Sequence, residues 1–408
     1  MSDQNNEKAL NYTRPTLSFN LTIILSIFYT IWRIPIVSLY MNTYIAMLLL
    51  VVLVLAVLFS SKIYGFKTGF VLSLGVFVVM MLIESHMKGI TFLNNIWSVF
   101  LSVLPVFVGF VLVVNKKDQI INRIVPVIII SYLLTAITTY TGLAIFPDAS
   151  RLLATGDDHY LTYFRYNIGG FGFIYSLTLL HPVIVGVLRF KKKPVWSLIF
   201  TLISGLCIFR SAYTMAALMF IISCLAYLLP VKENTKKVAR QIKFFAFGLI
   251  FLFLIAPWVL DKIANWPFLS DSADKIQDIA NILRGLETST DDAESRRNLY
   301  MRSWESFLTN PVFGSFFEES GILSGHSLIL DIMAQWGILG LSVVIILFIE
   351  FGKSHKVFAG SSPIYNFTLL SLMTSAILST LNPRMWTYEL GFALPLFIRY
   401  IVSSSKNS

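Results

Sequence analysis

The chain has 408 residues, of which 56% are hydrophobic and only 13% are charged, and its formal net charge is +10. Its mean hydropathy of +0.73 lies far above the range of soluble proteins. This composition excludes a soluble or purely structural protein and predicts an all-α polytopic membrane protein. Cys207 and Cys224 both fall in apolar runs, so no disulfide framework is indicated.

Long apolar runs recur along the chain and predict membrane-spanning helices. Each supplies roughly 17–25 apolar residues, enough to cross a hydrocarbon core of about 30 Å as a helix. The charge-free runs are 34–61, 89–115, 124–147, 166–188, 211–231, 332–349 and 357–383. Shorter or interrupted runs lie at 15–32, 68–83, 194–209, 244–260 and 385–402. Together they predict about twelve spans. The first and last are the least regular, because Arg33 lies near the end of one and Glu389 within the other.

Clusters of lysine and arginine determine the predicted orientation. They lie at Lys62/Lys67, Lys116/Lys117/Arg123, Arg189 to Lys193, Lys232 to Lys243 and Lys353/Lys356. With twelve spans, these loops and both termini fall on one side of the membrane. Cytoplasmic loops collect basic residues, so that side is predicted to be cytoplasmic. The positive charge is therefore a topology signal, and no nucleic-acid partner is expected.

Two substantial loops remain on the external side, at residues 147–165 and 261–325. The chain is thus predicted as one membrane domain, 1–408, with spans over 1–260 and 326–402 on either side of the longer loop. That loop holds eleven acidic and six basic residues, and four of the basic residues are arginines. Arginine is suited to bidentate capture of phosphate and carboxylate. The loop therefore favours an anionic, lipid-linked ligand.

The longer loop is predicted to form two helices. The first, residues 271–287, has an apolar stripe of Ile276, Ile279, Leu283 and Leu286. The second, residues 293–309, has a stripe of Leu299, Tyr300, Trp304, Phe307 and Leu308. It ends at Asn310-Pro311. Arg296 falls on the side of this stripe, toward the membrane domain. The alternative is that the helices only cap the surface and that Arg296 reaches lipid headgroups.

Short motifs in this region resemble the signature of the O-antigen polymerase and ligase superfamily. They are Ser295-Arg296, Asn310-Pro311-Val312-Phe313-Gly314, Gly325-His326-Ser327 and Gln335-Trp336-Gly337-Ile338-Leu339-Gly340-Leu341. The earlier Ile208-Phe209-Arg210-Ser211-Ala212 looks like the superfamily's serine-arginine-small motif. The chain departs from the pattern at Ser327, where asparagine is usual, and at Phe209, where serine is usual.

The resemblance implies a Wzy-type polysaccharide polymerase, a multi-pass glycosyltransferase of the bacterial cytoplasmic membrane. Such an enzyme joins oligosaccharide repeat units carried on undecaprenyl diphosphate at the outer face of that membrane. It makes a capsule, an O-antigen or another surface glycan, by inversion and without a metal or other cofactor. Carried over to this chain, the site consists of Arg210, Arg296 and His326. A chain-length regulator and a flippase are the candidate protein partners.

Six further residues are candidate substrate contacts because of their type and their predicted location. They are Arg297, Tyr300 and Arg302 in the long loop, Arg151 and Arg165 at the first loop, and Arg384 between the last two spans. For Arg151 and Arg165 the alternative is a solvated loop, and for Arg384 it is headgroup anchoring.

Other ionisable residues near spans have separate interpretations. Arg33 is a functional candidate because charges within spans are rare, although its position also permits snorkelling to the external surface. His181 is expected to bond a helix carbonyl beside Pro182, and His355 is expected at the surface.

Two alternative functions stay open. A ligase would use the same residues to move a finished glycan to another acceptor. A lipid-linked oligosaccharide flippase or other transporter would be expected to show an internal repeat with broken helices at matching positions. No such symmetry is visible, and the long loop belongs to the second half alone, so the polymerase is preferred.

Overall fold

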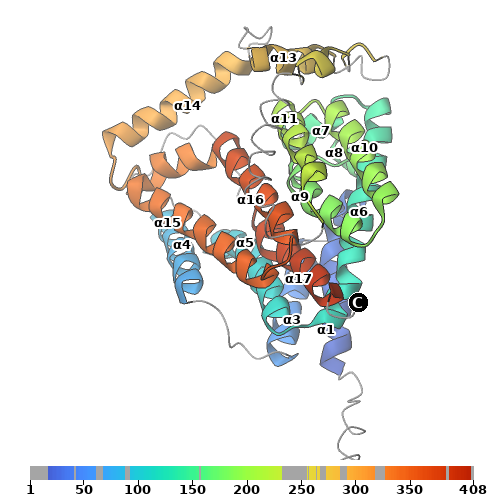
Figure 1. The fold of residues 1–408 in the computed structure, drawn as a ribbon. Helices are drawn as coiled ribbons and strands as arrows, with labels where there is room; N and C mark the ends of the chain where they lie inside the picture. The colour runs from blue at the N-terminus through green and yellow to red at the C-terminus, as the bar shows by residue number, and fades with distance from the viewer. Residues whose placement is uncertain are drawn as a thin grey trace, which may run out of the picture.

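The computed structural model of the chain (Figure 1) describes residues 17–40, 43–60, 68–87, 92–155, 158–231, 255, 257–262, 264–266, 273–284, 292–317, 327–382 and 386–405. Within these ranges every regular element is a helix, so the predicted helical class is confirmed. Most of the predicted span at 244–260 lies outside the described residues.

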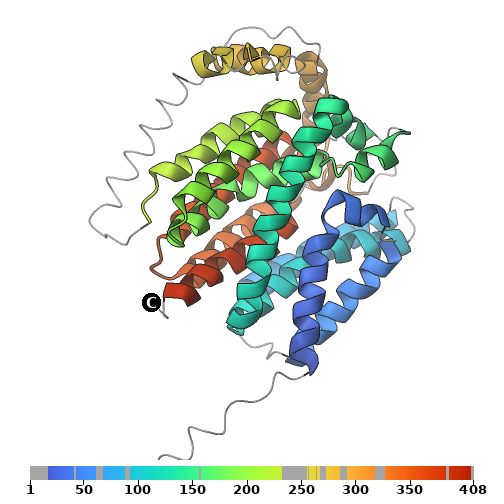
Figure 2. The ribbon, with the colours of Figure 1, turned by 90° about the vertical axis from the view of Figure 1, so that its right-hand side faces the viewer.

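The first half of the chain builds one side of the bundle and its centre. Its helices are α1 (Leu17–Trp32), α2 (Pro35–Tyr40), α3 (Thr43–Ser60), α4 (Thr68–Met87), α5 (Phe92–Val114) and α6 (Asp118–Ile145). Helix α6 packs against α1 on one side and against α10 and α17 on the other. Figure 2 shows it running between the N-terminal helices and the later ones.

The remaining helices complete the bundle and cover one end of it. Two short helices follow α6, namely α7 (Ala149–Thr155) and α8 (Tyr160–Arg165). Then come α9 (Phe171–Phe190), α10 (Pro194–Arg210), α11 (Thr214–Ser223) and the 3₁₀ helix η1 (Cys224–Leu228). The last are α13 (Ala273–Arg284), α14 (Asp292–Thr309), α15 (Leu328–Ala359), α16 (Ile364–Leu381), the π-helix η4 (Tyr388–Ala393) and α17 (Leu394–Ser405).

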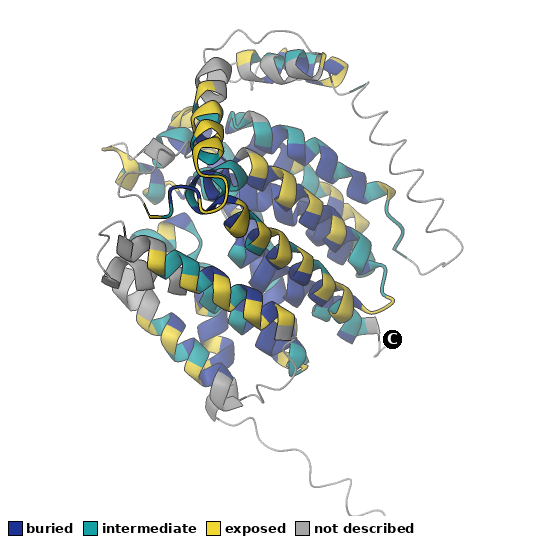
Figure 3. Cartoon of the chain, turned by 90° about the vertical axis from the view of Figure 1, so that its left-hand side faces the viewer, coloured by how far each residue is buried: buried dark blue, intermediate teal, exposed yellow. Residues whose placement is uncertain are grey.

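In the described part of the chain, three helices are long and apolar enough to cross a membrane. They are α6, α9 and α15, with mean hydropathies of 2.0, 1.9 and 2.4 over their apolar windows. The outward face of α15 is also apolar, since Ile338, Leu339, Ile345 and Ile346 are exposed. Figure 3 shows such exposed positions along the outside of the bundle, with the buried ones inside. An apolar surface of this kind is costly in water and is matched by a lipid bilayer.

The two ends of the bundle differ in character. One end, here named the loop face, carries α7, α8, α13 and α14 together with the end of α10 and the start of α11 (Figure 1). Basic side chains gather at the opposite end, where Arg189 donates to the carbonyls of Ala226 (2.8 Å) and Leu229 (3.1 Å). At the same end Arg399 bonds both carboxylate oxygens of Asp118, at 2.6 and 2.7 Å. Basic groups there stabilise exposed helix carbonyls and join α6 to α17.

The helices of the long loop lie where the sequence predicts them, with one correction. Helix α13 falls within 271–287 and buries Ile276, and α14 ends at Thr309, just before Asn310-Pro311. The predicted stripe of α14 is wrong in part, because Trp304 and Leu308 are 39% and 58% exposed. The buried face centres instead on Ser303, whose hydroxyl donates to the Asp331 carboxylate of α15 at 3.0 Å.

Two histidine predictions are also corrected. His355 is buried rather than at the surface, because α15 continues to Ala359, well beyond the apolar run that ends at residue 349. The His181 side chain meets the hydroxyls of Ser223 (2.8 Å) and Thr201 (2.9 Å) rather than a helix carbonyl.

Candidate functional site

Arg210 lies on the loop face, at the last position of α10. The chain reverses at once, because Ala212 adopts a positive φ of 57° and the buried Ser211 hydroxyl donates to the Ile208 carbonyl at 2.7 Å. The Arg210 guanidinium lies 5.3 Å from the centroid of the Tyr140 ring of α6. The turn and this cation–π contact hold the Arg210 side chain between α6 and α10.

Arg151 lies on an element bonded directly to this turn. The Tyr213 hydroxyl, just after the turn, donates to the Ser150 carbonyl at 2.8 Å. Ser150 and Arg151 both belong to α7, and Arg151 is half-buried. The structure therefore brings together the elements that carry Arg210 and Arg151.

Of the remaining candidate site residues, the structure describes the side chains of some and not of others. Arg165 ends α8 and is exposed; on α14, Arg302 is exposed and Tyr300 is half-buried. Arg296 and Arg297 belong to α14, but their side chains lie outside the described part. His326 and Arg384 lie outside the described residues altogether.

The described neighbours of His326 and Arg384 are bonded to one another. The backbone amide of Leu328 donates to the Asn382 carbonyl at 2.9 Å, which joins the start of α15 to the end of α16. Ser327 caps α15, since its hydroxyl accepts from the Leu330 amide at 3.1 Å. The serine that departs from the superfamily pattern thus has a helix-capping role here.

Two motifs of the superfamily resemblance meet backbone to backbone where α14 joins α15. The Ser315 amide donates to the Ala334 carbonyl at 2.8 Å, and the Ile338 amide donates to the Pro311 carbonyl at 2.9 Å. At the contact, Gly337 breaks the helical conformation of α15 with φ 61° and ψ −154°. The turn 311–314 is thereby seated in a kink of α15.

Glycine is required on both sides of this contact. A Cβ on Gly314 would lie 2.4 Å from the Ala334 carbonyl oxygen, and one on Gly337 would lie 2.3 Å from the Val312 carbonyl oxygen. Both residues also have positive φ, which glycine alone adopts at little cost. The Pro-x-x-Gly turn and the Gly-Ile-Leu-Gly run therefore act as one structural joint that holds α14 on α15.

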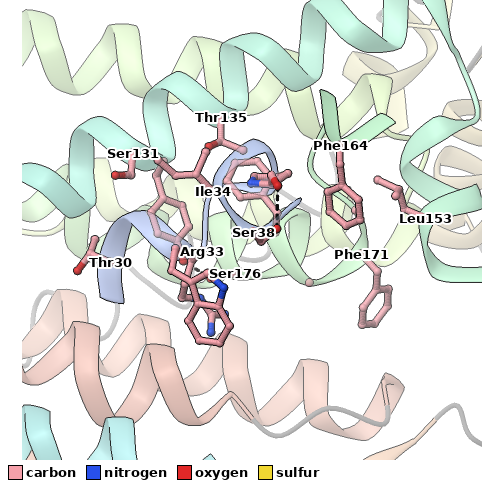
Figure 4. Close-up of a pocket in the computed structure, with 16 residues that line it drawn as sticks. Thr30, Arg33, Ile34, Ser38, Ser131, Thr135, Leu153, Phe164, Phe171 and Ser176 are labelled. Atoms are coloured by element: carbon pink, nitrogen blue, oxygen red, sulfur yellow. Dashed lines mark hydrogen bonds between the residues drawn. The ribbon is translucent and has the colours of Figure 1, made fainter. Parts of the chain in front are cut away.

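A cavity of about 530 Å³ lies beside α7 and α8 (Figure 4). Its wall comes from α1, the α1–α2 turn, α6 and α9, and Leu153 of α7 and Phe164 of α8 also line it. Polar lining groups include Arg33, Ser131, Tyr132, Thr135 and Ser176. Of these, only Arg33 was a functional candidate from sequence. The hydroxyl residues lie in apolar runs with no motif, so no local signal identifies them.

No family model matches this chain, and the search of curated proteins also finds no match. The resemblance therefore stays a sequence-based expectation, and function must be argued from the arrangement of the residues.

We expect replacement of Gly337 by alanine to destabilise the joint between α14 and α15. The backbone conformation alone should cost about 1–3 kcal/mol with a side chain present, and the Cβ would also strike the Val312 carbonyl. The melting temperature of the purified protein in detergent should fall clearly. Gly352→Ala on the same helix is the control, since open space surrounds it and alanine favours the helix. Equal melting temperatures for the two variants would contradict the joint.

Proposed function

We propose that the chain is a membrane glycosyltransferase that polymerises oligosaccharide repeat units carried on undecaprenyl diphosphate. It acts at the outer face of a bacterial cytoplasmic membrane. The observation that carries the proposal is the seating of the turn 311–314 in the Gly337 kink. This contact unites two motifs of the superfamily resemblance, and it ties the arginine-bearing α14 to the helix that begins two residues after His326.

The proposed topology has about twelve spans, with both termini in the cytoplasm. The gathering of basic residues at the end of the bundle opposite the loop face supports it, since cytoplasmic loops collect lysine and arginine. Lys116, Arg189, Lys191 and Lys353 lie toward that end. The loop face is then extracytoplasmic.

The chemistry is a single displacement at the anomeric carbon of the lipid-linked sugar. An acceptor hydroxyl oxygen forms the new bond to that carbon, while the bond from the carbon to the phosphate oxygen breaks. The electron pair leaves with undecaprenyl diphosphate, and the acceptor proton passes to His326, whose ordinary pKa of about 6.5 suits a general base. No metal is required, because diphosphate is already a good leaving group.

The arginines stabilise the charge that develops on the departing phosphate oxygens. Arg210 and Arg296 are assigned this role, since the guanidinium fork bonds two phosphate oxygens at once. Arg151 is the supporting candidate, because α7 is bonded to the turn that follows Arg210. Arg165, Arg297, Tyr300, Arg302 and Arg384 are assigned contacts to the saccharide or the lipid headgroup.

Loss of the protein should leave single repeat units on the lipid carrier, with no long chains. The expected profile is the same in a host carrying His326→Ala, because the acceptor hydroxyl then has no base. The measurement is the size distribution of lipid-linked saccharides, with His159→Ala as the control for an exposed histidine of the loop face. Long chains stranded on the carrier would identify a ligase instead, and intermediates trapped on the cytoplasmic side a flippase.

Arg296→Lys should not restore polymerisation, because a point charge cannot replace the bidentate fork. We expect turnover to fall by roughly 10²-fold or more, the scale for losing one charge-stabilising donor. The matched control is Arg284→Lys in the same loop, where Arg284 ends α13 and pairs with Asp261. Full activity of Arg296→Lys in a reconstituted assay would remove Arg296 from the site.

A further inference from the structure

The wall of the cavity beside α7 and α8 is backed by a charged network inside the helix bundle. The carboxylate of Glu389, on η4, is 1% exposed, and its Oε1 lies 3.7 Å from Nη2 of Arg33. Ser176 of α9 donates its hydroxyl to Glu389, and Tyr132 of α6 bonds that same serine. Because Ser176 has one proton, Tyr132 is the donor to it. Four elements thus meet in one polar chain.

The network holds the side chains that line the cavity in fixed positions. The Arg33 guanidinium also lies 4.1 Å from the centroid of the Tyr388 ring. Glu389 and Tyr388 belong to a π-helix, a rare conformation that is frequent at functional sites. Its backbone is pressed against α5, where a Cβ on Gly109 would lie 2.3 Å from the Gly391 carbonyl oxygen. Glu389 is therefore a positioning residue behind the wall, while Arg33, Tyr132 and Ser176 reach the cavity.

A side-chain bridge also fixes the position of α2, which contributes Pro35 and Ser38 to the cavity wall. Asn167, which has a positive φ of 54°, accepts from the Ile36 amide at 3.0 Å and donates to the Thr138 hydroxyl at 2.8 Å. The Asn167 side chain therefore ties α2 to α6. The Arg33 side chain keeps 30% of its surface exposed and lines the cavity, so its N–H groups are presented to a ligand.

The chemistry of the lining favours a neutral ligand that is rich in hydroxyl groups. Arg33 is balanced by Glu389, so neither an anion nor a cation finds an uncompensated partner. Hydroxyls of Ser131 and Thr135 can donate and accept, as sugar hydroxyls do, and the Tyr132 oxygen can accept while its proton is donated to Ser176. Rings of Trp32 and Phe171 offer apolar faces. A purely apolar occupant such as an acyl chain would exclude water from these polar groups and offer them no hydrogen bond in return.

We propose that this cavity is a saccharide-binding subsite, in which Arg33, Tyr132 and Ser176 bond a neutral sugar of the lipid-linked substrate. The inference rests on the proposed function, which supplies the lipid-linked saccharide. Helix α7 lines the cavity through Leu153 and carries Arg151 two residues earlier. The cavity therefore borders the helix that bears one of the candidate arginines. The cavity volume falls in the range of about 300–1,000 Å³ typical of small-ligand sites.

The test is protection of a thiol placed in the cavity. Ser38 lines the cavity and is half-buried, so Ser38→Cys in the full-length protein places a reactive group there with little change of shape. A water-soluble maleimide is applied with increasing amounts of oligosaccharide fragments of the host's own surface polysaccharide. The wild-type protein gives the background labelling of Cys207 and Cys224, and Asp158→Cys is the matched exposed thiol of the loop face outside the cavity.

We expect the fragments to protect the thiol of Ser38→Cys in a saturable way and to leave that of Asp158→Cys reactive. Combining Ser38→Cys with Glu389→Gln should raise the fragment concentration that protects half of the thiol roughly ten-fold. A change of this size corresponds to the loss of one hydrogen bond to a charged group. Tyr132→Phe keeps the aromatic ring and should also raise this half-protecting concentration. It replaces Glu389→Gln in the test if that variant does not fold.

Three results would overturn the subsite. They are equal protection of both thiols, protection by inorganic pyrophosphate but not by the sugars, and a Ser38→Cys thiol that never reacts because soluble ligands cannot enter. Labelling requires no turnover, so the two proposals fail separately. Sugar protection without polymerisation would count against the proposed function alone, and polymerisation without protection would count against the subsite alone.

Discussion

The pairing of Arg33 with Glu389 is the interaction on which this arrangement of helices depends. Either charge alone within an apolar bundle would cost several kcal/mol, so the first and last parts of the chain must meet. Their contact brings the α1–α2 turn against the π-helix, and the hydroxyls of Ser176 and Tyr132 extend it to α9 and α6. The cavity beside α7 and α8 follows from that meeting, since Arg33, Tyr132 and Ser176 form part of its wall and Glu389 lies behind them.

Sharp turns hold the helices of the loop face in place. The α10–α11 turn presents Arg210, the Tyr213 hydroxyl ties that turn to α7, and the turn 311–314 locks α14 onto α15. Each turn depends on a backbone conformation or a close approach that few residue types allow. The turn after Arg210 and the Tyr140 ring therefore hold that arginine in place, as electrostatic stabilisation of a leaving group requires.

Apolar runs predicted the helices well because hydropathy acts locally, and Asn310-Pro311 predicted the end of α14 for the same reason. The sequence did not predict that the turn 311–314 and the Gly337 kink contact each other, although both are motifs of the resemblance. Long-range partners could not be predicted. Nothing near Arg33 indicates that its counter-charge lies at position 389, and the polar Ser303–Asp331 contact turned α14 away from its apolar stripe. The prediction that His355 lies at the surface was wrong because α15 remains helical through the polar segment that contains it.

Reconstitution tests the central claim most directly. Lipid-linked repeat units, extracted from a host lacking the protein, would be mixed with the purified full-length chain in liposomes without added metal. The proposed polymerase activity predicts a ladder of longer lipid-linked saccharides, with release of one undecaprenyl diphosphate for each bond formed. Repeat units that stay single, or that only exchange between the two leaflets, would contradict it.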